Sequence, residues 1–179
     1  MRHGATAWSA SGQHTGLTDL DLSPQGEAEA RGLGPRLPRP WDQVLCSDRL
    51  RAIRTAELAG YPDAVPSPLL REVDYGRYEG LTTAEIWAQD PSWEVFSSGC
   101  PGGESPAQVM ERCRRFLIQL PKSGRVLIFS HGHISRALAA EFVNLGAPLA
   151  ARLALSTASM SHLVWSERGP LIQSWNLTA

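Results

Sequence analysis

The chain has 179 residues, of which 42% are hydrophobic, and this length and composition fit one domain with a hydrophobic core. Its formal net charge is −1 and its 17 Lys and Arg residues are scattered, which excludes the basic surface of a nucleic-acid-binding protein. The longest apolar runs, such as residues 126–129, are far too short to cross a membrane.

The first part of the chain contains two predicted helices and one predicted strand. Ser23 is placed to cap a helix over residues 24–37, which a following Pro-Arg-Pro sequence would end. Residues 41–46 are typical of a short strand, and residues 48–58 are typical of a second helix. A strand thus separates two helices, as in α/β proteins.

The rest of the chain continues the alternation of helices and strands. The predicted elements are a helix capped by Thr82 or Thr83 and ending at Ala88, a helix over 106–120 capped by Ser105, a strand over 125–130, a helix over 134–145 ended by Gly146, and strands over 162–166 and 171–175 joined by a turn at 169–170. Residues 90–104, rich in Gly, Pro and Ser, are expected to form a functional loop. The order predicts an α/β three-layer sandwich, with a mainly parallel central sheet and helices on both faces.

Five side chains with the chemistry for phosphoryl transfer fall at the start of the chain or at predicted element ends. They are Arg2, His3, Arg51, Glu72 and His131. Arginine guanidinium groups and histidine can stabilise the negative charge on phosphoryl oxygens by hydrogen bonds, without a metal ion. A carboxyl group can protonate a leaving alkoxide. Because strand ends in such sheets collect catalytic groups, we expect these side chains to meet in one site.

Six blocks in order resemble the histidine phosphatase superfamily, which is also described as phosphoglycerate-mutase-like. The blocks are Arg2-His3-Gly4-Ala5-Thr6-Ala7-Trp8, residues 15–23, residues 47–56, residues 70–80, residues 101–105 and Ser130-His131-Gly132. The resemblance covers nearly the whole chain and implies a single histidine phosphatase domain over residues 1–179.

The resemblance also implies a role for each matching residue. His3 would be the nucleophile that becomes phosphohistidine, and Glu72 would donate the proton to the leaving group. Arg2, Arg51 and His131 would form the phosphate pocket. The side of the site facing the substrate would be lined by Ser9, Thr15, Gly16, Tyr75 and Gly132. No metal and no cofactor are implied, and two neighbouring arginines should lower the pKa of His3 and keep it nucleophilic.

Other chemistries fit the sequence less well. A cysteine phosphatase needs five residues between its cysteine and arginine, whereas four separate Cys46 from Arg51, and no GxSxG motif of a serine hydrolase occurs. His131-x-His133 lacks nearby carboxylates and is a weak signal for a metal site. A non-catalytic phospho-ligand module of the same fold would be expected to lack the nucleophile or the proton donor. The remaining polar candidates are expected to be structural, solvated or only adjacent to substrate: Arg49, Arg54, Asp74, Glu79, His14, His133 and His162.

The predicted reaction is hydrolysis of a small phosphorylated metabolite. The resemblance implies that phosphoglycerate mutases have longer chains, with an insertion between the glutamate block and the second histidine block that covers the active site. Here Glu72 and His131 are only 59 positions apart. Residues 11–19, 93–100 and 131–133 resemble sedoheptulose-bisphosphatase-like and acid phosphatase members, which implies a sugar phosphate. Mutase-type transfer and a non-catalytic binding module stay as alternatives.

The expected partner is thus a small phosphorylated substrate, without nucleic acid or membrane, and the oligomeric state stays open between monomer and homodimer. Three cysteines without CxxC spacing indicate reduced thiols and a cytoplasmic location. The resemblance implies a hydrophobic strand before the block that contains the first histidine, whereas only Met1 precedes that block here. We therefore expect the natural protein to begin upstream, and His3 to lie on a loosely held terminus without that strand.

Overall fold

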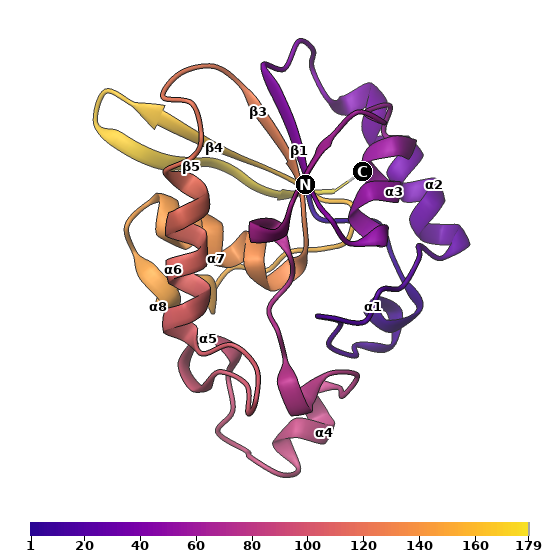
Figure 1. The fold of residues 1–179 in the computed structure, drawn as a ribbon, viewed down its shortest axis with the longest axis vertical. Helices are drawn as coiled ribbons and strands as arrows, with labels where there is room; N and C mark the ends of the chain where they lie inside the picture. Colours follow the sequence, from indigo (N-terminus) through magenta and orange to yellow (C-terminus); the bar gives the residue numbers. More distant parts are fainter. Residues whose placement is uncertain (179) are drawn as a thin grey trace.

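A three-stranded parallel sheet lies at the centre of the fold in this computed structural model, which describes residues 1–178. Its strands, in spatial order, are β2 (Val65–Ser67), β1 (Gln43–Ser47) and β3 (Val126–Phe129). A separate antiparallel pair, β4 (Met160–Ser166) and β5 (Gly169–Leu177), extends to one side (Figure 1). Because β1 pairs with both neighbours in parallel, the carboxyl ends of these strands meet at one edge.

Helices lie on both sides of the parallel sheet (Figure 1). The α-helices are α1 (Ala7–Ser11), α2 (Pro24–Leu33), α3 (Leu50–Leu58), α4 (Thr83–Trp87), α5 (Val95–Ser98), α6 (Pro106–Leu117), α7 (Gly132–Phe142) and α8 (Gly146–Ala150). Short 3₁₀ helices cover Gly34–Arg36, Pro68–Leu70 and Gly76–Tyr78. No helix within residues 1–178 has the length and apolar character needed to cross a bilayer.

The sheet has a hydrophobic core on each face. Alternate side chains of β1 and β3 point to opposite faces, as the period of a strand requires. Cys46 and Phe129 pack with Leu33 of α2 and Ala56 of α3. Leu45 and Ile128 pack against the other core, which contains buried side chains of α6 and α7 such as Phe116 and Ile134. The prediction of a three-layer arrangement is therefore confirmed.

Three predicted helix caps are also confirmed. The Ser23 side chain accepts a hydrogen bond from the Gly26 amide, and the Thr82 and Ser105 side chains each take part in a reciprocal capping box. These side chains satisfy amides that have no partner inside the helix, which is why the starts of α2, α4 and α6 are so visible in the sequence.

Other predicted boundaries were wrong. Gly146 starts α8 instead of ending the preceding helix, which stops at Phe142. Gly169 and Pro170 are the first residues of β5, so the turn lies just before them. The segment 90–104, expected to be a loop, contains α5 and contributes buried side chains to one core.

The beginning of the chain is held firmly in the fold. The Ser130 amide donates to the Met1 carbonyl at 2.9 Å, and the His3 amide donates to the Ser130 carbonyl at 2.9 Å. On the other side, the Ala158 amide donates to the His3 carbonyl at 3.0 Å. The expectation that His3 lies on a loosely held terminus is therefore wrong, because its backbone is bonded to chain on both sides.

Candidate active site

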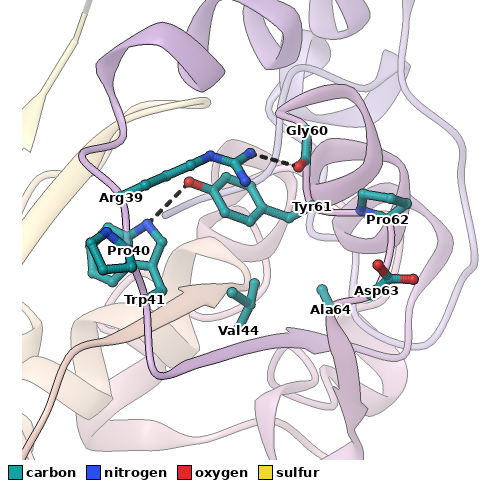
Figure 2. A pocket seen from close by; sticks show the side chains of 9 residues that line it. All are labelled: Arg39, Pro40, Trp41, Val44, Gly60, Tyr61, Pro62, Asp63 and Ala64. Carbon is teal, nitrogen blue, oxygen red and sulfur yellow. Dashed lines mark hydrogen bonds between the residues drawn. The ribbon is translucent and has the colours of Figure 1, made fainter.

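Two cavities are candidates for the site. The larger, of about 340 Å³, is lined by residues 39–41, Val44 and residues 60–64, and contains no histidine (Figure 2). There the Arg39 guanidinium donates to the Gly60 carbonyl, and the Trp41 indole donates to the Tyr61 hydroxyl. None of the predicted site residues lines this cavity.

The second cavity is a cleft of about 150 Å³ that collects most of the predicted site residues. Its lining residues are Arg2, His3, Ser9, Gly12, Gln13, His14, Thr15, Glu72, Tyr75, Gly132, His133, Arg136 and Leu155. Of the ten predicted residues, only Arg51, His131 and Gly16 are absent from this lining, and they contact the residues that form it.

His3 is held as a neutral nucleophile. Its Nδ1 lies 2.7 Å from the Gly4 carbonyl, so Nδ1 carries the proton and donates it there, leaving a lone pair on Nε2. Burial, followed by the positive charges of Arg2 and Arg51, keeps the pKa of His3 well below its usual value. The imidazole therefore stays neutral at neutral pH, as attack on phosphorus requires.

Gly4 lets the chain beside His3 pass close to α2. A Cβ atom at Gly4 would lie 2.3 Å from the Gly26 carbonyl oxygen, a distance that no side chain can adopt. The Gly4 amide donates to the Thr55 hydroxyl at 3.1 Å, and this hydroxyl donates to the Arg51 carbonyl. The backbone after His3 is thus fixed against both α2 and α3.

Arg51 joins the second histidine to the loop at residues 15–18. Its Nε donates to His131 Nδ1 at 3.1 Å, and its Nη atoms donate to the carbonyls of Thr15 at 2.9 Å and Thr18 at 3.1 Å. Because Nδ1 of His131 accepts this bond, the proton of the neutral ring sits on Nε2. Burial and then the charge of Arg51 keep the pKa of His131 well below its usual value.

Two buried donors next to His3 have no partner within residues 1–178. They are Nε2 of His131 and Nε of Arg2. The His131 ring lies 5.2 Å from the His3 ring, centroid to centroid, and Arg2 lines the same cleft. Buried donors without acceptors are costly, and an anion with several oxygen acceptors would satisfy both.

Glu72 is fixed by three backbone amides, two of which lie at the start of α7. Its Oε1 accepts from Val73 at 3.0 Å and from Ile134 at 2.8 Å, and its Oε2 accepts from His133 at 3.0 Å. The carboxyl group is almost fully buried and lines the cleft beside His3. The cleft therefore contains, together with His3, a carboxyl group of the kind that can protonate a leaving group.

The family model for the histidine phosphatase superfamily (branch 1) matches residues 1–178. The chain belongs to the histidine phosphatase superfamily. An acid phosphatase of Mycobacterium tuberculosis is 43% identical over 89% of this chain and 82% of its own length. Sedoheptulose 1,7-bisphosphatase of Saccharomyces cerevisiae is 33% identical over 82% of this chain and 67% of its own. A probable phosphoglycerate mutase GpmB of Erwinia tasmaniensis is 30% identical over 98% and 87%.

The structure agrees with this membership. The solved structure of the Mycobacterium tuberculosis open reading frame Rv3214 superposes with a TM-score of 0.94 at 40% identity, covering 99% of this chain and 95% of that one. The acid phosphatase and bisphosphatase relatives support a histidine phosphatase, that is, a hydrolase, and the fold is the phosphoglycerate-mutase-like fold expected from the sequence.

Among the predicted lining residues of this histidine phosphatase, Ser9, Thr15, Tyr75 and Gly132 lie in the cleft. Gly16 does not line it, although its carbonyl accepts from Arg51 at 3.3 Å. Glu79, which the sequence predicts to be a surface carboxylate, accepts hydrogen bonds from the amides of Gly16 and Thr18. It therefore holds the loop whose carbonyls bind Arg51.

Three further side chains with ionisable groups line the cleft, namely His14, His133 and Arg136. The sequence predicts a structural or substrate-adjacent position for the two histidines and no role for Arg136. The spacing of three residues between His133 and Arg136 places both on one face of α7, and this periodicity is the signal that could have found Arg136.

Proposed function

We propose that this protein is a metal-independent phosphomonoesterase that acts through a phosphohistidine on His3 and hydrolyses a small phosphorylated metabolite. The observation that carries the proposal is the neutral, buried His3 next to two buried donors that have no partner among residues 1–178. A nucleophile with a free lone pair beside unpaired donors for an anion is what covalent phosphoryl transfer requires.

In the first step, Nε2 of His3 attacks phosphorus, the N–P bond forms and the ester P–O bond breaks. Glu72, in its protonated form, gives its proton to the leaving alkoxide. Arg2 and His131 donate to the phosphoryl oxygens, and Arg51 holds the second histidine in the tautomer that can donate. Arginine and histidine donors thus meet the negative charge that a metal ion meets in other phosphatases.

In the second step, water attacks the phosphorus of phosphohistidine. Glu72, now a carboxylate, takes a proton from this water, the N–P bond breaks, and inorganic phosphate leaves with His3 restored. Using one carboxyl group first as acid and then as base follows from microscopic reversibility.

The proposed substrate class is a sugar phosphate or a similar small phosphomonoester. The support comes from the relatives, since one is an acid phosphatase and another a bisphosphatase of the sugar sedoheptulose. Phosphoglycerate mutase activity is the second candidate, because a probable mutase aligns with 98% of this chain. The short span between Glu72 and His131 favours hydrolysis, because no long insertion between them covers the cleft from water.

The test measures phosphate release from a panel of phosphomonoesters, with EDTA present. Labelled substrate quenched in alkali should leave radioactive phosphate on the wild-type protein. The His3→Ala variant should show neither label nor turnover. His162→Ala, a variant on β4 with no place in the cleft, is the matched control and should keep both. Turnover that needs a metal, or label that persists in His3→Ala, would reject the proposal. Sustained interconversion of 2- and 3-phosphoglycerate without phosphate release would favour the mutase.

A further inference from the structure

Arg112 on α6 uses all five of its N–H donors within the fold. Its Nε and Nη2 form a bidentate ion pair with the Glu104 carboxylate, at 2.8 and 2.7 Å. Its Nη1 donates to the carbonyls of Leu69 at 3.0 Å and Arg71 at 2.7 Å, and its Nη2 also donates to the carbonyl of Glu72 at 3.3 Å. One guanidinium thus joins a carboxylate to three carbonyls of the segment that ends at the proposed proton donor.

The segment that carries Glu72 depends on side chains for its hydrogen bonds. Residues 71–75 lie between two 3₁₀ helices and are irregular. The Leu70 carbonyl accepts from the Ser130 hydroxyl at 2.8 Å, and Arg112 binds the carbonyl before it and the two after it. Polar main-chain groups away from water need partners, and here two side chains supply them for four consecutive carbonyls.

The ion pair between Arg112 and Glu104 holds the main chain on both sides of the Glu72 side chain. Arg112 binds the carbonyl of Glu72 and the one before it, whereas Oε2 of Glu104 accepts from the Asp74 amide at 2.9 Å. The Glu104 amide in turn donates to the Asp74 carbonyl at 2.9 Å. The two charged side chains are only 14% and 21% exposed, so solvent and salt screen this pair little. The backbone of Glu72 is therefore held from α6, while α7 binds its carboxyl group.

We propose that Arg112 is a positioning residue for the reaction, which fixes the main chain of Glu72 so that its carboxyl group meets the leaving-group oxygen. The inference rests on the proposed function, in which Glu72 is the proton donor. Among residues 1–178 the cleft lining includes Glu72 but not Arg112, so Arg112 acts through Glu72 and not on the substrate. A displacement of about 1 Å at a reacting group can lower the rate about 100-fold. Lysine, with three donors on one nitrogen, cannot replace this guanidinium in full.

The test measures kcat/KM of the full chain for an alkyl phosphate, fructose 6-phosphate, and for p-nitrophenyl phosphate, whose leaving group needs no proton. Arg112→Met should lower the ratio of the first value to the second by about 10- to 100-fold, because a misplaced Glu72 impairs only the protonated departure. Inhibition by inorganic phosphate should stay unchanged, because Arg2 and His131 remain in place. Arg112→Lys should recover part of the ratio, because it restores the charge with fewer donors.

The same helix supplies the matched control. Arg114→Met removes an exposed ion pair with Glu111 and should leave the ratio unchanged. Because Arg112→Met leaves the Glu104 carboxylate without its partner, the double variant Arg112→Met with Glu104→Gln is measured in parallel, and it should show the same fall in the ratio. Equal losses on both substrates in the folded variants would show a general structural role and overturn the inference.

Failure of the proposed function has a separate signature. If the wild-type chain hydrolyses neither substrate, the proposed function fails, and hydrogen exchange of the full chain decides the inference. The amides of His133 and Ile134 bind the Glu72 carboxyl group, so Arg112→Met should speed their exchange relative to the amides of β1, whereas Arg114→Met should not. Unchanged exchange at both amides in Arg112→Met would overturn the inference.

Discussion

Replacing Glu72 with glutamine should impair hydrolysis in a way that depends on the leaving group. The amide side chain of Glu72→Gln would have no proton to give to an alkoxide, and general acid catalysis contributes about 10²- to 10⁴-fold. We expect kcat/KM for alkyl phosphates to fall by this factor, or ~3–5 kcal/mol at ~1.36 kcal/mol per tenfold. p-Nitrophenolate is a stable anion that leaves without protonation, so hydrolysis of p-nitrophenyl phosphate should fall much less.

The structure also gives the stability cost of Glu72→Gln. The carboxyl group accepts two amides on Oε1 and one on Oε2. An amide side chain can accept only through its single oxygen, and its NH₂ group would then face the third backbone N–H. One buried donor is left unpaired, which costs about 1–3 kcal/mol. Urea unfolding should show this loss, and the variant should still fold.

Parallel assays of the two substrate types test whether Glu72 protonates the leaving group. If Glu72→Gln loses the same factor on alkyl phosphates and on p-nitrophenyl phosphate while remaining folded, Glu72 does not protonate the leaving group. Its role would then be limited to holding the start of α7.

Three other perturbations have expected outcomes. Gly4→Ala should lower the free energy of unfolding by about 1–3 kcal/mol, seen in urea unfolding, because its Cβ would lie 2.3 Å from the Gly26 carbonyl oxygen. Glu79→Ala should weaken inhibition by inorganic phosphate about tenfold, because two amides of the loop that holds Arg51 lose their acceptor. The free energy of unfolding should fall as pH drops below about 6.5, the usual histidine pKa, because the lowered pKa of His3 means that the unfolded chain binds protons first.

Each of these has a control and a contradicting result. Gly32→Ala is the control for Gly4, since a Cβ there meets nothing, and equal stability of the two variants would contradict the packing argument. Glu79→Gln keeps one acceptor oxygen and should lose less phosphate affinity than the alanine variant; the reverse order would reject a positioning role. His3→Asn should make the pH profile below about 6.5 less steep without abolishing it, because His14, His131 and His133 also have lowered pKa values; an unchanged slope would exclude a contribution from His3.

Local chemistry in the sequence predicted the elements that have strong local signals. The caps at Ser23, Thr82 and Ser105 satisfy helix amides through neighbouring side chains, so they need no tertiary context. The strand at β3 is a continuous apolar run. By contrast, β2 has only three residues with a proline at its centre, and its pairing with β1 depends on distant parts of the chain.

The residues of the site show the same contrast between local sequence signals and long-range contacts. Ordered blocks identified the side chains that meet at His3, because each block carries its own recognisable spacing. No single block predicts the supporting contacts. Glu79 accepts a hydrogen bond from the amide of Gly16, which lies 63 positions earlier in the chain. Arg136 lines the cleft because of its position on α7. Long-range contacts of this kind follow from the folded arrangement and not from local pattern.

The start of α7 couples two parts of the site. His131 is the N-cap residue of α7, and the amides of His133 and Ile134 in its first turn bind the Glu72 carboxyl group. The second histidine and the carboxyl group are thus attached to one rigid element, so a shift of α7 would move both together and keep the distance between them.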